Sequence, residues 1–284
     1  MKSIKHIIFI LTILVFTSCE DYLEPEPTSV ISSVNFYSDE TQLMQGVFNM
    51  YDGLQGMNDT SSRSNHATQI EFYVTEMRSD NTRSKSGEGE AAQFDNFAVE
   101  ATNGLIADHY RSFYNVIFRA NTVLENIGVA SESNKAKIEG EAKFVRAYVY
   151  FNLVRLYGAL PLIDNVVSVG DDASYIRRSV EDVYELIVSD LNSAVAGLDN
   201  FNGKNRATKS AAQGLLAKVH LTLGNYLEAQ QLLESVMSEG FILEPNFSDV
   251  FFNESNSEVI FSIGYTSGLV QDLSLIHISE PTRH

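Results

Sequence analysis

The residues of this 284-residue chain that could perform catalysis do not form a recognisable catalytic pattern. The stretch Gly87-Glu88-Gly89-Glu90 lacks the third glycine of a dinucleotide-binding loop, and its carboxylates would repel phosphate. The six histidines are scattered, and neither a His-Glu-x-x-His zinc motif nor a Gly-x-Ser-x-Gly nucleophile elbow is present. Many acidic residues could supply a glycosidase pair, but sequence alone selects no two at the required separation. We therefore predict a protein that is not an enzyme and has no metal ion or cofactor.

The single cysteine, Cys19, has a position that indicates covalent modification. Two lysines precede an apolar run over 7–16, which is the order of an export signal. This run is shorter than the roughly 20 apolar residues that a membrane-spanning helix needs. Phe16-Thr17-Ser18-Cys19 resembles the lipobox of bacterial lipoproteins, in which the cysteine sulfur takes a diacylglycerol. We predict that residues 1–18 are a lipoprotein signal peptide and that Cys19 is the lipid attachment site.

A second group of residues has the chemistry to bind sugars. Aromatic faces stack on sugar C–H surfaces, and amides or carboxylates bond the hydroxyl groups, usually from loops. Residues 58–103 are rich in Ser, Asn, Asp and Gly, which predicts long loops with a short strand at 70–74. The alternative is that the aromatic residues only pack these loops onto helices, and the lack of tryptophan disfavours starch-like stacking. The ligand-binding candidates are Tyr73, Asp80, Asn81 and Phe94.

The charge of the chain excludes some classes of partner. The net charge is −17, and removal of the two lysines in residues 1–18 leaves 18 basic against 37 acidic side chains, or −19. Such a surface repels phosphate backbones and anionic membrane faces, so no nucleic-acid partner is expected. A hydrophobic content of 44% and an aromatic content of 11% are typical of a globular protein with a sizeable core.

Helices are predicted wherever apolar residues recur every three or four positions. Gly158, followed by Pro161, is the expected end of one helix, and Ser179 with Asp182 forms a variant capping box at the start of another. A short strand is expected over 257–263. The predicted helices cover residues 38–56, 110–124, 138–157, 179–195, 208–223 and 226–237.

The last two predicted helices resemble a tetratricopeptide hairpin. The stretch "LAKVHLTLGNYLEAQQLLESV" has Leu-Gly before the turn and Tyr after it, and Ala229 follows where two helices pack closely. The predicted fold class is therefore mainly α, a tetratricopeptide-like helical-repeat scaffold with long loops and a few short strands.

Several segments, in this order and spacing, resemble the SusD/RagB family of outer-membrane nutrient-binding lipoproteins. The resemblance implies a surface-exposed lipoprotein that captures an oligosaccharide, or alternatively a peptide, and delivers it to a SusC-like TonB-dependent outer-membrane transporter. It also implies a lipid-anchored location facing the exterior. A tetratricopeptide-like adaptor that binds only protein is the rival interpretation. The matching segments are "SCEDYLEPEP", "FYNVIFRANTVLENI", "GEAKFVRAYVYFNLVRLYGALPLI", "RSVEDVYELIVSDLNSAVAGL" and "RATKSAAQGLLAKVHLTLGNYLEAQQLLESVMSEGFIL".

The resemblance also suggests how the chain is divided. Glu20 and Asp21 look like the acidic signal that sends such lipoproteins to the outer leaflet, although an ordinary solvated linker has the same composition. Family members are longer, so we expect an N-terminal part of such a protein. The expected segments are a signal peptide (1–18), an acidic tether (19–34), an incomplete SusD-like helical domain (35–272) and a tail (273–284) that matches nothing in the family and looks non-native.

Overall fold

The computed structural model describes residues 36–55, 67–168, 170–171, 175–253 and 256–264. The chain divides into two compact units, Met1–Ser38 and Asp39–His284. In the described end of the first unit, the rings of Phe36 and Tyr37 meet edge to face with centroids 5.0 Å apart. The predicted signal peptide, tether and tail lie outside the described residues, and these domain boundaries stay predictions.

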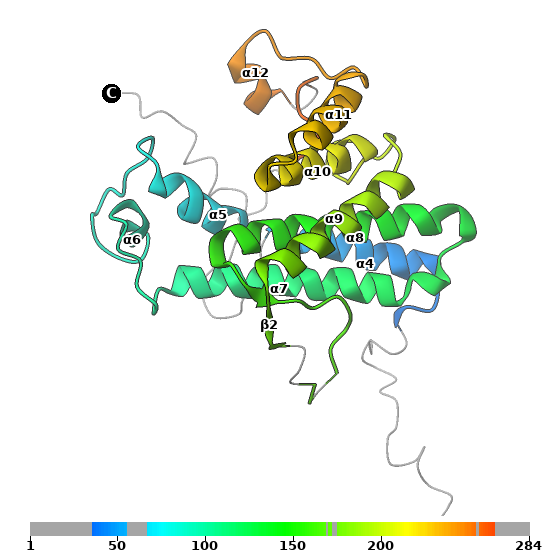
Figure 1. The fold of residues 1–284 in the computed structure, drawn as a ribbon, viewed down its shortest axis with the longest axis horizontal. Coiled ribbons are helices and arrows are strands. Elements are labelled where there is room, and N and C mark those ends of the chain that lie inside the picture. Colours follow the sequence, from blue (N-terminus) through cyan, green and yellow to red (C-terminus); the bar gives the residue numbers. More distant parts are fainter. Residues whose placement is uncertain (1–35, 56–66, 169, 172–174, 254–255, 265–284) are drawn as a thin grey trace, which may run out of the picture. The chain divides into compact units, whose positions relative to one another are not determined.

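The second unit is mainly helical, as the sequence predicts (Figure 1). Two short strands, β1 (Leu160–Pro161) and β2 (Arg177–Arg178), pair antiparallel, with Pro161 opposite Arg177. Two 3-10 turns, η1 (Glu76–Arg78) and η2 (Ile127–Val129), accompany the α-helices. These helices are α4 (Glu40–Gln55), α5 (Ala67–Thr75), α6 (Ala92–Asp95), α7 (Gly104–Glu125), α8 (Glu132–Tyr157), α9 (Val180–Gly197), α10 (Lys209–Leu223), α11 (Tyr226–Met237) and α12 (Phe247–Phe252).

Helix α8 is the centre of this unit, because it is covered by α4, α7 and α9 and is buried around most of its circumference. Its buried residues include Val149 and also the polar Glu141 and Arg146, which must therefore find internal partners. The approach of α9 to α8 is close, since a Cβ atom at Gly197 would collide with the main-chain carbonyl of Ala136. Only glycine fits at that position without moving the helices apart.

The predicted helix ends are confirmed. Gly158 follows α8 with φ 71°, a conformation that glycine adopts without strain. At the start of α9, the Ser179 hydroxyl accepts a hydrogen bond from the Asp182 amide at 3.1 Å, and the Asp182 carboxylate accepts one from the Ser179 amide at 3.3 Å. This reciprocal capping box satisfies two backbone donors that a helix start leaves free.

The tetratricopeptide-like hairpin is present as α10 and α11, which pack against each other across the turn at Gly224. Ala229 is only 3% exposed, so the small residue predicted in the close contact does lie in it. Helix α10 also packs on α9, which continues the stack of helices from α7 through α11.

Two strand predictions are wrong. Residues 70–74 belong to helix α5, where Ile70 and Val74 are buried at helical spacing. A short β-branched and aromatic run does not distinguish a strand from a helix. Residues 257–263 form no strand, because their hydrogen bonds reach two separate segments. Those bonds run from the Ile242 amide to Ser257 and from the Ser262 amide to Lys204.

Candidate functional site

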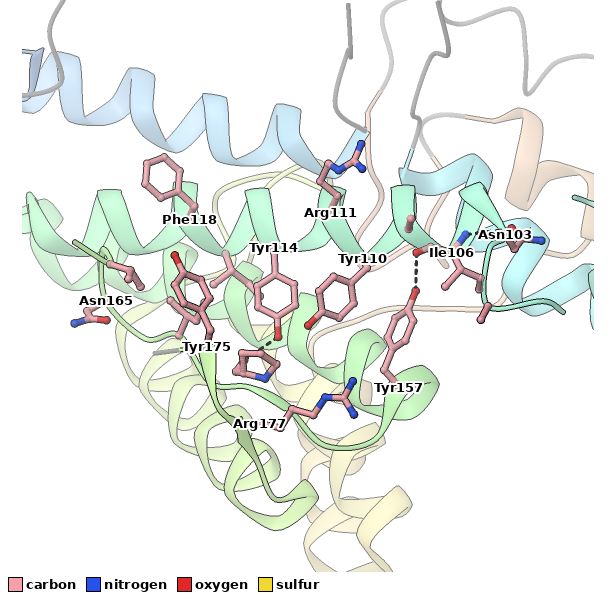
Figure 2. A pocket seen from close by; sticks show the side chains of 16 residues that line it. Asn103, Ile106, Tyr110, Arg111, Tyr114, Phe118, Tyr157, Asn165, Tyr175 and Arg177 are labelled. Atoms are coloured by element: carbon pink, nitrogen blue, oxygen red, sulfur yellow. Dashed lines mark hydrogen bonds between the residues drawn. The ribbon is translucent and has the colours of Figure 1, made fainter. Parts of the chain in front are cut away.

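A cavity of about 930 Å³ opens beside α7, where α8 ends and the two strands pair. Sixteen residues line it, and Figure 2 shows their side chains. Tyr110 and Tyr114 project from the same side of α7, with ring centroids 4.6 Å apart. Tyr157, the last residue of α8, meets the Tyr110 ring edge to face at 5.3 Å. Together the three phenol rings form an aromatic wall.

A second wall is the segment 161–167, which begins at the last residue of β1. Its main-chain carbonyl groups accept hydrogen bonds of 2.8 to 3.0 Å from side chains on α7 and α8. Because these donors belong to packed helices, the segment is fixed to the scaffold before any ligand arrives. The bonds run from Tyr114 to Pro161, from Tyr150 to Ile163, from Arg146 to Asp164 and from Asn121 to Asn165.

A buried ion pair lies behind this second wall. The Arg146 guanidinium donates from Nε and Nη2 to the two carboxylate oxygens of Asp190, at 2.7 and 2.8 Å. Its Nη1 also donates to Oδ1 of Asn121 at 2.8 Å. The pair is almost completely buried, with side chains 6% and 2% exposed. One arginine on α8 therefore joins α7, α9 and the cavity wall in a single hydrogen-bond network.

His109 supports the aromatic wall from the other side of α7. Its Nδ1 lies 3.0 Å from the Tyr157 hydroxyl, and that hydroxyl donates to the Ile106 carbonyl at 3.2 Å. With the single phenol hydrogen assigned to Ile106, the tautomer that completes this network has the hydrogen on Nδ1 of His109. Nε2 is then the unprotonated nitrogen, and it has no hydrogen-bond partner among the described residues. Burial lowers the pKa of His109 to about 4, so the ring is neutral at pH 7.

Tyr114 and Tyr157 of the wall are neutral as well. Burial raises the pKa of Tyr114 and of Tyr157 above the usual tyrosine value, because a phenolate would lose its hydration there. Both hydroxyl hydrogens are already donated to main-chain carbonyls, so their oxygens are left as acceptors. Donors at the cavity come from the Asn165 amide and the Arg177 guanidinium. This combination of aromatic faces, acceptors and donors can bind a polyhydroxylated ligand.

A smaller hollow of about 300 Å³ adjoins the cavity, since Ile106 and Tyr157 line both. Phe97 stands at this hollow with 72% of its surface exposed. Its φ of 54° is unusual for a bulky residue, and such strain is typical of binding sites. Arg78 also lines the hollow and provides a charged group beside the phenylalanine.

The structure places one of the four predicted ligand-binding residues, Phe94, at this smaller hollow and does not bring the four together. Phe94 is 2% exposed in a hydrophobic cluster, and partly buried Tyr73 packs against the same cluster. Asp80 and Asn81 are exposed on the turn that follows η1. Phe94 lines the smaller hollow, and none of the four lines the large cavity. Their role in ligand binding stays a prediction, as does that of Cys19, which lies outside the described residues.

The residues that form the aromatic wall were missed at the sequence level. Tyr110 and Tyr114 fit the apolar stripe of a helix, and Tyr157 fits a core position, so periodicity assigned all three to packing. One signal was available, because each of these positions holds a tyrosine rather than a purely apolar leucine or phenylalanine. A buried tyrosine needs a hydrogen-bond partner, and a half-buried one presents both an apolar face and a polar end.

Among the described residues, no helix has the length and apolar character required to cross a membrane. In the same part of the chain, His, Cys, Asp and Glu side chains form no group of three or more that could hold a metal ion.

The family model and the related sequences that match this chain all belong to one family. The family model that matches, SusD-like, carries the description "Starch-binding associating with outer membrane" and covers residues 21–221. A SusD-like protein of Bacteroides ovatus is 28% identical over 275 residues, which is 90% of this chain and 48% of that protein. SusD-like protein P38 of Formosa agariphila is 29% identical over 284 residues, 93% of this chain and 54% of that protein. The chain thus spans about half the length of the curated relatives it matches.

Solved structures agree with this assignment. A SusD-like protein of Bacteroides fragilis superposes with a TM-score of 0.69 and 28% identity, covering 81% of this chain and 45% of the other. A laminarin-binding SusD-like protein has a TM-score of 0.63 and 25% identity, with coverage of 76% and 50%. A structure with a xylogluco-oligosaccharide has a TM-score of 0.65 and 26% identity, with coverage of 78% and 46%. The chain therefore belongs to the SusD-like family, whose model carries the description "Starch-binding associating with outer membrane".

Proposed function

We propose that this chain is part of a surface-exposed outer-membrane lipoprotein that captures oligosaccharides and delivers them to a TonB-dependent transporter. The observation that carries the ligand class is the tyrosine-lined cavity. Its volume of about 930 Å³ is near the upper end of the roughly 300–1,000 Å³ of small-molecule sites. Aromatic faces suit sugar C–H surfaces, while phenol oxygens, Asn165 and Arg177 suit the hydroxyl groups.

The comparisons support this ligand class. One solved relative is named for laminarin binding and another holds a xylogluco-oligosaccharide, and both are at least 25% identical to this chain. The family description supports the outer membrane as the location. The transporter partner and the outward orientation rest on the family alone; copurification of a TonB-dependent transporter with the natural protein would test the partner.

We expect Tyr175→Ala to weaken oligosaccharide binding about tenfold, or about 1.4 kcal/mol. Tyr175 lines the cavity with 60% of its surface exposed, so the change removes a stacking face without opening the core. The measurement is calorimetric titration with laminari-oligosaccharides and xyloglucan oligosaccharides, with chromatography to confirm that the sugars are recovered uncut. Tyr226→Ala is the matched control, because Tyr226 is 69% exposed on α11 and lies outside the cavity.

Three results would contradict the proposal. Binding of peptides but of no sugar would favour peptide capture. Equal losses of affinity in Tyr175→Ala and Tyr226→Ala would mean that the cavity is not where the sugar binds. Cleavage of the oligosaccharides would show an enzyme.

Cys19 is proposed as the lipid anchor, because it is the sole cysteine and follows an apolar run with lipobox-like residues. Each buried methylene of an acyl chain contributes roughly 0.8 kcal/mol, so several chains hold a folded domain at a membrane. Metabolic labelling with a palmitate analogue is expected to mark the natural protein in its host and to leave Cys19→Ala unmarked. Label retained by the variant would rule out this anchor.

A further inference from the structure

The large cavity differs in charge from the rest of the protein. The chain has 37 acidic and 20 basic side chains, so an average surface would present more carboxylates than cations. The sixteen described residues that line the cavity include Arg111 and Arg177, and none of these sixteen is an aspartate or a glutamate. We infer that the ligand of this cavity is an anionic oligosaccharide, one that carries carboxylate or sulfate groups. This inference rests on the proposed function and specifies its substrate class.

Arg177 is the main determinant of this charge. It lies on β2 opposite Pro161, whose carbonyl is held by Tyr114, so its backbone position is fixed by the cavity wall itself. Figure 2 shows Tyr110 and Tyr114 projecting from α7 towards the side where Arg177 stands. Arg177 is exposed, and no carboxylate of the described residues lies within ion-pair distance of it. Its guanidinium is therefore free to bind a ligand anion.

Arg111 adds a second cation at the edge of the cavity. It projects from a different side of α7 than the tyrosines, and its side chain is 57% exposed. Its ion pair with Asp108 is loose, at 3.6 Å, and Asp108 does not line the cavity. A solvent-exposed pair of this kind contributes little and does not cancel the positive charge on the cavity side.

The physical reason for an anionic ligand is the balance of long-range and local charge. A net charge of −17 repels anions at a distance, so a cavity for neutral sugars would have no need of the Arg177 guanidinium, for which no carboxylate of the described residues lies within ion-pair distance. A guanidinium presents a planar fork of donors that matches the two oxygens of a carboxylate or sulfate. Beside low-dielectric aromatic walls, this charge-assisted contact is stronger than it would be in water.

The test compares sugars that differ only in charge. Laminarin oligosaccharides and their sulfated forms make one pair, and methyl-esterified and free oligogalacturonates make the other. We expect the natural sequence to bind the charged member of at least one pair at least tenfold more tightly, with affinity falling as salt is raised from low to physiological concentration. The pair of sugars in which the charged member binds more tightly shows whether the cavity recognises sulfate or carboxylate.

Arg177→Gln is expected to abolish this preference, because it removes the positive charge that binds the anionic group. Arg178→Gln is the matched control, because Arg178 is the next residue on β2, is also exposed, and does not line the cavity. Both variants change the net charge by the same amount, so a long-range effect would affect them equally. A preference kept in Arg178→Gln and lost in Arg177→Gln supports the inference.

The contrary outcomes separate the two proposals. Equal affinity for both members of each pair would overturn the anionic ligand and leave oligosaccharide capture standing. Equal losses in Arg177→Gln and Arg178→Gln would overturn the role of the cavity arginine in the same way. Failure to bind any of the four sugars would overturn the inference, and failure to bind xyloglucan oligosaccharides as well would overturn the proposed function.

Discussion

Replacement of Asp190 by alanine is expected to lower the free energy of unfolding by about 3–5 kcal/mol. The Asp190 carboxylate is 2% exposed and receives two hydrogen bonds from Arg146, at 2.7 and 2.8 Å. Without it, a guanidinium that is itself 5% exposed would remain in the core with no counter-ion. Breaking a buried pair from one side is far more destabilising than removing both partners. Urea denaturation of the variant and the natural sequence would measure the change.

Two controls make this result specific. Glu185→Ala removes an exposed carboxylate from the same helix and is expected to leave the denaturation midpoint unchanged. Asp190→Leu combined with Arg146→Met removes both charges and is expected to recover part of the lost stability. A loss below about 1 kcal/mol in Asp190→Ala would mean that water reaches Arg146, against the burial described here.

The same substitution should loosen the binding site. Arg146 holds the Asp164 carbonyl and the Asn121 amide, and Asn121 in turn holds Ile163 and Asn165. Amide hydrogen exchange in residues 161–165 should therefore become faster in Asp190→Ala under native conditions. A wall that must be ordered on binding also lowers ligand affinity. The ion pair thus links the stability of the helical scaffold to the shape of the cavity.

The helical scaffold could be predicted because its signals are local. The apolar positions of α8 recur at helical spacing, Gly158 ends that helix, and Ser179 with Asp182 starts the next. Each of these features depends on residues within a few positions of one another, so the sequence carries them directly. The tetratricopeptide-like pair was found for the same reason, through the turn glycine and Ala229.

The cavity could not be predicted, because it joins segments that are distant in sequence. Tyr110 and Arg177 line the same cavity only because β2 pairs with β1. Strands of two residues give no periodic signal in the sequence. The buried partners of Arg146 likewise come from α7 and α9, so the sequence shows an arginine in an apolar stripe without its counter-ion. In residues 58–103, composition could not distinguish buried Phe94 from exposed Phe97, since that difference depends on how α6 packs.

A second large effect is expected from pH, through His109. The ring is fully buried, and desolvation lowers its pKa to about 4, while the same histidine in the unfolded chain titrates near its ordinary value of 6.5. Protonation would place the charge on Nε2, for which the described residues offer no acceptor. Between these two pKa values the unfolded chain binds a proton that the folded chain does not. Lowering the pH through this window therefore favours unfolding.

The free energy of unfolding should consequently fall by about 3 kcal/mol between pH 6.5 and pH 4 from this residue alone, and the contribution of His109 should level off about one pH unit below its folded-state pKa. Carboxylates also titrate near the lower end, so the contribution is isolated by comparison with His109→Gln, which keeps a donor for the Tyr157 hydroxyl but has no titratable ring. Denaturation midpoints measured at half-unit pH steps should show a shallower decline for the variant. Parallel curves of denaturation midpoint against pH for the two proteins would mean that the fold accommodates the protonated His109 ring. The hydrogen bond of the neutral ring to Tyr157 would then not be what holds the aromatic wall in place.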